Sequence, residues 1–251
     1  MKSVCTLLAL TGLFASSAFA QSNDAVADSG DGEMVVPQLR PQVPNYSLDT
    51  RTFVFPSGLT VYMQEDHSQP MVAITTVFDR GSTADPRGKE GIAHFVEHFW
   101  FKSRHLRQED PETGEILVEG PRTWDVLSEM GCGLNASTSN DWTNYMTICP
   151  KSALKPLIKL ASLRMTDAVG GTYPEEVESE REVIRNELRM RMENGGGEAL
   201  RYIYDRIYAP DHPYHHMTIG THSSLDNVTH ADIEQFTKDH YRPENATIVI
   251  V

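Results

Sequence analysis

The residues most suited to chemistry are His94, Glu97 and His98, which lie close together in one apolar segment. On an α-helix, positions i, i+3 and i+4 share one face, so two imidazoles and a carboxylate would converge there. Two neutral imidazoles and one further carboxylate commonly form a catalytic zinc site with one position open for water. Phe95 and Val96 separate these residues, so we expect a largely buried helix in which unpaired titratable groups would be costly. The alternative is an accidental cluster on a solvated helix face.

A further protein ligand is expected on another element, and the acidic helix predicted at Pro174–Met192 is the richest source of carboxylates. At about 100° per residue, Glu180 and Glu187 project into the apolar face of this helix. Glu176 also projects inward, but it lies in the first turn, where carboxylates favour the helix N-terminus anyway. The residues that define the apolar face are Val177, Val183, Ile184 and Leu188.

The helix projection leaves the roles of Glu180 and Glu187 open. One of them would bind the metal, and the other would hold a metal ligand in place by hydrogen bonding. The alternative is that these acids form salt bridges with Arg181, Arg185 or Arg191 on the same helix.

Several segments, taken in chain order, resemble a known peptidase family. They are Gly81-Ser82, Gly91–His98, Gly133–Ser139, Glu180–Glu187 and Tyr241–Thr247. The order His-x-x-Glu-His, the reverse of His-Glu-x-x-His, is itself a metallopeptidase motif. Together the segments resemble the inverted-motif zinc peptidases that include pitrilysin, insulin-degrading enzyme and mitochondrial processing peptidase. The resemblance extends over roughly Thr52 to Val251.

The resemblance implies a role for each residue of the motif. His94, His98 and Glu187 would bind one Zn²⁺ per chain, and Glu97 would be the general base of peptide hydrolysis. Glu180 would be the carboxylate behind a metal ligand. The resemblance thus favours Glu187 over Glu180 as the third ligand, a choice that the helix projection does not make.

The resemblance also implies how substrates and partners would bind. An extended peptide or unfolded polypeptide would lie beside the edge strand at Asn135 and Ala136, and a second homologous domain or subunit would complete the enzyme. The sequence stops inside the apolar strand Ile248–Val251. We therefore expect a fragment or a subunit that binds zinc alone but has weak or absent turnover.

The rival hypothesis is a non-catalytic or regulatory partner subunit that keeps the fold and the zinc site but needs another chain for turnover. The presence of His94, Glu97, His98 and Glu187 favours activity, because such subunits typically lose part of the motif. A purely structural zinc site would need a fourth protein ligand. No cysteine lies near the motif in the predicted layout.

The predicted elements mix strands and helices without regular alternation, which indicates an α+β domain with helices packed on a mostly antiparallel sheet. This would be one half-clamshell domain of the family. Strands are expected at Thr52–Phe55, Leu59–Gln64, Met71–Phe78, Leu134–Ser139, Thr143–Ile148 and Thr247–Val251. Helices are expected at Gly88–Lys102, Arg122–Met130, Lys151–Ala168, Pro174–Met192, Glu198–Tyr208 and His230–His240. The polar segment Arg104–Pro121 is expected to be an inserted surface loop.

Cys132 and Cys149 would face each other across a hairpin whose two-residue turn is Asn140-Asp141. We predict a disulfide between them, because the expected compartment is oxidising. Two buried thiols are the alternative, since a longer turn would shift the register.

The ends and the charge of the chain suggest its compartment. Met1–Ala20 resembles a secretory signal peptide, residues 21–45 form an acidic and proline-rich leader predicted to be disordered, and 46–251 form one domain. We therefore expect a periplasmic or secreted protein with no membrane span after signal cleavage. Because 35 acidic residues exceed 22 Lys and Arg, for a net charge of −13, nucleic acid and anionic membranes are disfavoured as partners.

Overall fold

The computed structural model describes residues 49–193 and 196–251. The predicted signal peptide and leader, residues 1–45, lie outside the described residues. None of the described helices is both long and apolar enough to cross a membrane.

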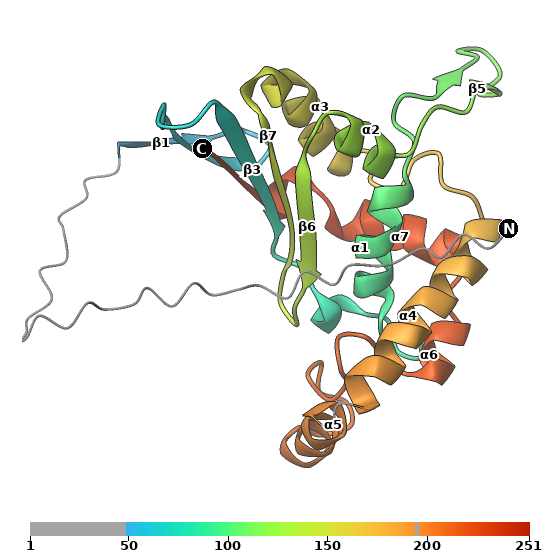
Figure 1. Cartoon of the computed structure of the whole chain (residues 1–251). Helices are drawn as coiled ribbons and strands as arrows, with labels where there is room; N and C mark the ends of the chain where they lie inside the picture. The colour runs from blue at the N-terminus through green and yellow to red at the C-terminus, as the bar shows by residue number, and fades with distance from the viewer. Residues whose placement is uncertain (1–48, 194–195) are drawn as a thin grey trace, which may run out of the picture. The chain divides into compact units, whose positions relative to one another are not determined.

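A six-stranded sheet with the strand order β1-β2-β8-β3-β7-β6 forms the base of the domain (Figure 1). Neighbouring strands are antiparallel except for the parallel pair of β2 and β8. The predicted α+β class with a mostly antiparallel sheet is therefore confirmed. The strands are β1 Thr50–Val54, β2 Thr60–Gln64, β3 Met71–Phe78, β6 Gly133–Thr138, β7 Thr143–Pro150 and β8 Ala246–Ile250.

One face of the sheet carries the core, as the alternation along β3 and β7 shows. Every second residue of both strands is buried, because successive side chains in a strand point to opposite faces. Phe78 of β3 stacks on Tyr241 with ring centroids 4.2 Å apart. The hydroxyl of Tyr241 lies 2.8 Å from that of Tyr145 on β7, which satisfies both buried hydroxyls.

Helices cover this face, and α1 lies between β6 and α4 (Figure 1). The predicted helix His230–His240 is found unchanged as α7, and its N-cap Thr229 forms a capping box with Asp232. The helices are α1 Ile92–Lys102, α2 Thr123–Glu129, α3 Leu154–Arg164, α4 Glu175–Glu193, α5 Gly196–Ile207, α6 His222–Asp226 and α7 His230–His240. The short helix α6 was not predicted.

Two predicted helices were too long. The helix expected at Gly88–Lys102 begins at Ile92, because Gly91 adopts φ 102°, a left-handed conformation outside the helix. The helix expected at Lys151–Ala168 is a 3₁₀ turn followed by α3, which ends at Arg164. Its end is closed by i→i+3 hydrogen bonds such as that from Met165 N–H to the carbonyl of Ser162.

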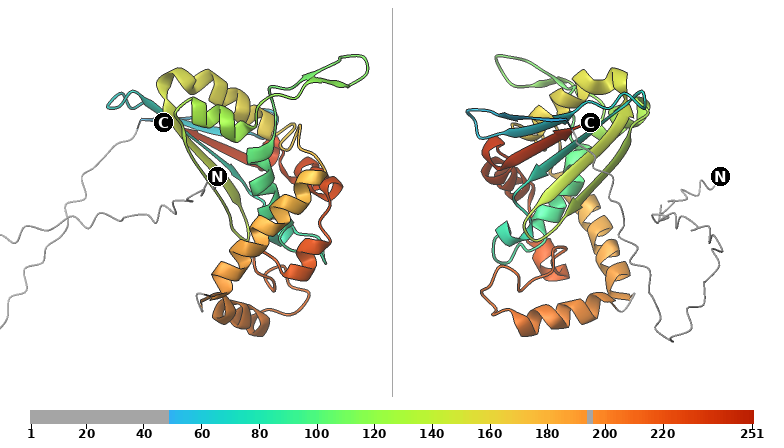
Figure 2. Two further views of the ribbon diagram at one scale, coloured as in Figure 1. Left: turned by 45° about the vertical axis from the view of Figure 1, so that its right-hand side comes forward. Right: turned by 90° about the vertical axis from the view of Figure 1, so that its left-hand side faces the viewer.

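The segment Arg104–Pro121 departs in part from the surface loop that was expected. It contains a small two-stranded ladder of β4, Gln108–Glu109, and β5, Ile116–Val118, which projects from the domain (Figure 2). Its first residue, however, is only 6% exposed. The Arg104 side chain binds the carbonyl oxygen of Gly171 and both carboxylate oxygens of Glu176, so the segment is anchored to α4.

The β6–β7 hairpin has the predicted register. Thr138 pairs with Thr143, and the N–H of Ser139 donates to the carbonyl of Trp142 at 2.8 Å, which leaves a two-residue turn. The structure joins Cys132 to Cys149 by a disulfide, with their Cα atoms 4.3 Å apart.

Candidate metal centre

The helix α1 presents the motif residues from an almost fully buried position. Most of its residues, including His94 and Glu97, are buried. Asp85 fixes the start of this helix by accepting the backbone N–H groups of Gly91 at 2.7 Å and Ala93 at 3.1 Å. Its carboxylate thereby satisfies donors that the first helical turn leaves free. Sequence reasoning missed Asp85, which lies outside the helix that it caps.

The helix α4 brings Glu187 to the two histidines of α1. Oε2 of Glu187 lies 3.6 Å from Nε2 of His94 and 3.6 Å from Nε2 of His98. The three ligand atoms lie within 4.8 Å of one another. Two ligands of a tetrahedral zinc ion at roughly 2.0–2.1 Å from the metal are about 3.3 Å apart. The donor set and its spacing therefore fit a zinc ion.

The protonation of these groups reflects burial and the charges of their neighbours. Burial, together with the nearby charge of His98, lowers the pKa of His94 to about 3, so its imidazole is neutral. Burial also disfavours a charged His98, but hydrogen bonds to Glu180 and Glu187 outweigh it and raise its pKa to about 9. Burial opposes ionisation of Glu187, yet its hydrogen bond to His98 and nearby cations lower its pKa to about 2. At neutral pH Glu187 is thus ionised, and the protonated His98 and Arg191 balance its charge.

Glu180 lies behind His98 and orients its ring. Its Oε1 is 2.7 Å from His98 Nδ1, and its Oε2 is 2.8 Å from the ammonium of Lys102. With a pKa of about 9, His98 carries protons on both ring nitrogens at neutral pH. A metal bound at Nε2 would replace the proton there, while Nδ1–H would still donate to Glu180. Lys102 was not predicted, although it follows His98 by one helical turn and the i, i+4 spacing could have indicated it. Nδ1 of His94, by contrast, has no hydrogen-bond partner among the described residues.

Glu97 lies on the same helix and is held by the sheet. Its side chain is buried, and its Oε2 accepts a hydrogen bond of 2.5 Å from the hydroxyl of Thr138 at the end of β6. Burial raises the pKa of Glu97, although the hydrogen bond from Thr138 opposes this. Sequence reasoning missed the contact, because no local pattern relates a strand residue to a helix residue so far along the chain.

The arginines of α4 settle which acids form salt bridges. Arg181 pairs with Glu178, and Arg185 pairs with Glu182 and Asp226, so neither binds Glu180 or Glu187. Arg191 pairs with Oε1 of Glu187. Glu187 therefore fits both the salt-bridge and the metal-ligand hypotheses. Its Oε1 pairs with Arg191, and its Oε2 faces His94 and His98.

One residue of the predicted apolar face of α4 is placed differently. Val183 is 49% exposed, whereas Val177, Ile184 and Leu188 are buried. The face that packs on the domain is narrower than the projected arc, and Val183 lies beyond its margin. The inward projection of Glu180 was correct, because this side chain is buried.

The strand β6 forms one edge of the six-stranded sheet. Here Asn135 and Ala136, the residues expected to bind substrate, lie next to each other. The side-chain oxygen of Asn135 accepts the backbone N–H of Ala136 at 2.9 Å. The backbone N–H of Ala136, on the edge strand, is thus already hydrogen-bonded by the neighbouring Asn135 side chain.

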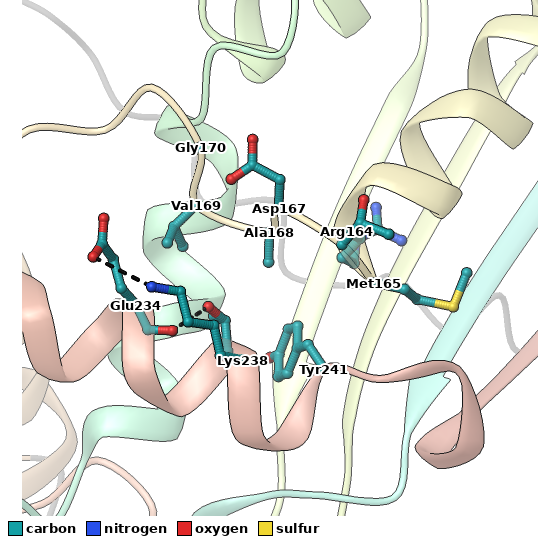
Figure 3. A pocket seen from close by; sticks show the side chains of 11 residues that line it. Arg164, Met165, Asp167, Ala168, Val169, Gly170, Glu234, Lys238 and Tyr241 are labelled. Atoms are coloured by element: carbon teal, nitrogen blue, oxygen red, sulfur yellow. Dashed lines mark hydrogen bonds and ion pairs between the residues drawn. The ribbon is translucent and has the colours of Figure 1, made fainter. Parts of the chain in front are cut away.

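A cavity of about 290 Å³ lies between the segment Arg164–Gly170 and α7, and none of the motif residues lines it (Figure 3). Lys238 points toward Glu234 there and lies 3.8 Å from its carboxylate. Asp167 pairs with Arg107 at 2.9 Å. Arg164, the remaining cation of the cavity, donates to the hydroxyl of Thr76 at 2.8 Å and packs over the Trp100 ring. The cavity therefore does not gather metal-binding side chains as His94, His98 and Glu187 do.

Comparison with known proteins places this geometry in a family. A family model described as Insulinase (Peptidase family M16) matches residues 60–201. The zinc protease PqqE of Helicobacter pylori is 29% identical over 183 residues, which cover 72% of this chain and 38% of that protein. The chain spans less than half the length of the curated relatives it matches.

Solved structures share the fold. The crystal structure of a protease from Helicobacter pylori has a TM-score of 0.66 and 26% identity, covering 82% of this chain and 47% of that chain. An inactive M16 peptidase domain from Pseudomonas fluorescens has a TM-score of 0.68 at 18% identity, covering 81% and 46%. This second likeness shows the fold alone. The resemblance inferred from the sequence is confirmed, and the chain belongs to the insulinase (M16) family of peptidases.

Proposed function

We propose that this chain carries the zinc centre and the general base of a metallopeptidase. The observation that supports this most directly is the meeting of His94, His98 and Glu187, which come from two helices and present their ligand atoms to one another. A partly buried set of two imidazoles and a carboxylate is a typical donor set of catalytic zinc sites. Zinc would occupy one site per chain.

The chemistry divides between the metal and the chain. When bound, zinc would polarise a peptide carbonyl and make a nearby water more acidic. Glu97 takes the proton of the attacking water and delivers it to the leaving amine, for which a raised pKa is suited. The hydroxyl of Thr138 keeps its carboxylate oriented, and Glu180 keeps the His98 ring oriented.

A peptide substrate would bind in an extended conformation along the free edge of β6. Main-chain hydrogen bonds of this kind recognise backbone more than side chains, so sequence specificity would be modest. The Asn135 side chain now accepts the N–H of Ala136. An added substrate strand would therefore displace this contact in order to pair with Ala136.

The complete enzyme would include a second homologous domain or subunit, because this chain spans less than half of its relatives. We propose a periplasmic or secreted location on the basis of the signal-like first 20 residues. The net charge of −13 disfavours nucleic acid as a partner.

Two measurements test the function. Metal analysis of the purified chain should find about one zinc ion per chain, and Glu97→Gln should retain it because Glu97 is not a ligand. Hydrolysis of a quenched fluorescent peptide is then measured with and without a complementary homologous domain. We expect hydrolysis that needs the second domain and that Glu97→Gln abolishes.

The outcomes separate the two hypotheses. Zinc binding with hydrolysis that is insensitive to Glu97→Gln would favour the non-catalytic partner subunit. Absence of zinc from the wild-type chain would contradict the metal centre itself.

A further inference from the structure

An apolar groove lies where α2, α3 and the two ends of the segment Arg104–Pro121 meet. Its volume is about 450 Å³, within the range of small-molecule sites. The residues that form its apolar wall include Leu106, Pro121, Val126, Met130, Leu160 and Leu163. None of the proposed metal ligands lines it. We call this feature the α2–α3 groove.

Unpaired positive charge borders the groove. Of the six described lysines, Lys89, Lys102 and Lys238 pair with carboxylates, whereas Lys151, Lys155 and Lys159 do not. Lys155 and Lys159, which line the groove, are exposed and form no ion pair within residues 49–193 and 196–251. They lie one turn apart on α3, on the same side of the helix. These two unpaired cations are available to an anionic group bound at the groove.

The interior of the groove is neutral and nearly without hydrogen-bonding groups. The Thr123 hydroxyl is already bound to the carbonyl of Ser103 at 3.0 Å. His105 stays neutral, because burial lowers its pKa to about 4. An extended peptide would leave its backbone N–H and C=O groups unpaired on such a wall, at considerable cost. An alkyl chain carries no such groups.

A small molecule fits the groove by itself, since a volume of about 450 Å³ is that of a drug-sized site. A stable protein interface of about 1,200–2,000 Å² would have to extend well beyond it. An apolar chain that ends in one anionic group matches both its wall and its border. The charge complementarity assigns the carboxylate to the two lysines.

We propose that the α2–α3 groove binds a single-chain fatty carboxylate, with the alkyl chain against α2 and α3 and the carboxylate at Lys155 and Lys159. The proposal is independent of the peptidase function. Burial of the alkyl chain provides most of the affinity, because it removes apolar surface from water. The two lysines provide the preference for an acid over an alcohol.

Binding is tested with dodecanoate below its micelle concentration, by calorimetry on the full chain. We expect saturable binding of one dodecanoate per chain, with weaker binding of 1-dodecanol and of hexanoate. Equal binding of dodecanoate and 1-dodecanol would overturn the role of the lysines. Absence of saturable dodecanoate binding would overturn the site.

Variants locate the ligand. The double change Lys155→Glu with Lys159→Glu should weaken dodecanoate binding at least about tenfold. The matched control is Arg87→Glu with Arg206→Glu, which alters the net charge equally at two exposed residues that do not line the groove. Val126→Trp should fill the groove and reduce binding of both dodecanoate and 1-dodecanol. Circular dichroism and thermal unfolding establish that each variant is folded.

One variant keeps this proposal separate from the proposed function. Glu187→Ala should lose zinc but bind dodecanoate like the wild type. Loss of dodecanoate binding in Glu187→Ala, or an equal loss in the lysine variant and its control, would contradict a distinct site in the groove.

Discussion

The two ends of α4 carry inward-facing carboxylates with opposite surroundings. Glu176, in the first turn, meets the guanidinium groups of Arg104 at 2.9 Å and Arg122 at 3.0 Å. Glu187, near the last turn, presents one oxygen to two imidazoles at 3.6 Å. The same residue type on one helix thus takes part in two kinds of cluster.

The difference lies in what the partners can do. An arginine is always protonated and donates only, so the cluster at Glu176 is complete within the protein. An imidazole can be neutral and offer a lone pair, so the cluster at Glu187 can accept a metal cation. Burial of a carboxylate alone therefore does not indicate a metal site. The chemistry of the facing side chains decides it.

The largest expected effect is loss of the metal. Glu187→Ala should reduce zinc from about one ion per chain to nearly none, because two histidines alone bind zinc weakly. Metal analysis after dialysis measures this. Glu193→Ala, an exposed acid at the end of the same helix, is the matched control. Full zinc content in Glu187→Ala would contradict Glu187 as a metal ligand, and with it the difference drawn between Glu187 and Glu176.

Glu176→Gln should lower the free energy of unfolding by about 2–3 kcal/mol, because the buried Arg104 loses its two-oxygen partner and keeps only Glu119, at 3.4 Å. Urea denaturation measures this, and the exposed neighbour Glu175→Gln should change little. Zinc content should stay at the wild-type value. If Glu176→Gln lost zinc but kept its stability, Glu176 would belong to the metal site and not to a structural ion-pair cluster.

Glu180→Gln should weaken zinc affinity about 10- to 100-fold, the usual effect of removing a carboxylate that orients a metal-bound imidazole. Competition with a zinc-chelating dye measures the affinity. Glu182→Gln changes an exposed acid on the same helix and should leave affinity unchanged. An effect as complete as that of Glu187→Ala would indicate that Glu180 is itself a ligand.

The smallest expected effect is on how the stability of the protein depends on pH. Burial disfavours ionisation of Glu176, but hydrogen bonds from Arg104 outweigh it and lower its pKa below the ordinary value of 4.5. A lowered pKa gives stability that is present above pH 4.5 and lost as pH falls through the folded-state pKa. The stability difference between wild type and Glu176→Gln should therefore narrow below pH 4.5. A difference that stays constant down to pH 3 would contradict ionisation of Glu176 as its source.

Local patterns predicted the elements that depend on local geometry. The alternation of Met71–Phe78 and the capping residues of His230–His240 fix both elements without help from distant residues. The turn at Asn140-Asp141 fixes the hairpin register, since a two-residue turn allows one pairing. Gly91 shows the limit, because its left-handed conformation and its approach to the carbonyl of Ile219 depend on tertiary contact.

What the sequence determined by itself is the shared helix face of His94, Glu97 and His98, because that follows from helix geometry alone. It also narrowed the third ligand to two inward acids, Glu180 and Glu187. The tertiary structure decided the rest, including the carboxylate that faces both Nε2 atoms. It also brought Thr138 into hydrogen-bond contact with Glu97, and Arg104 into contact with Glu176 in the first turn of α4. These contacts join segments far apart in the chain, and periodicity carries no information on how two elements pack.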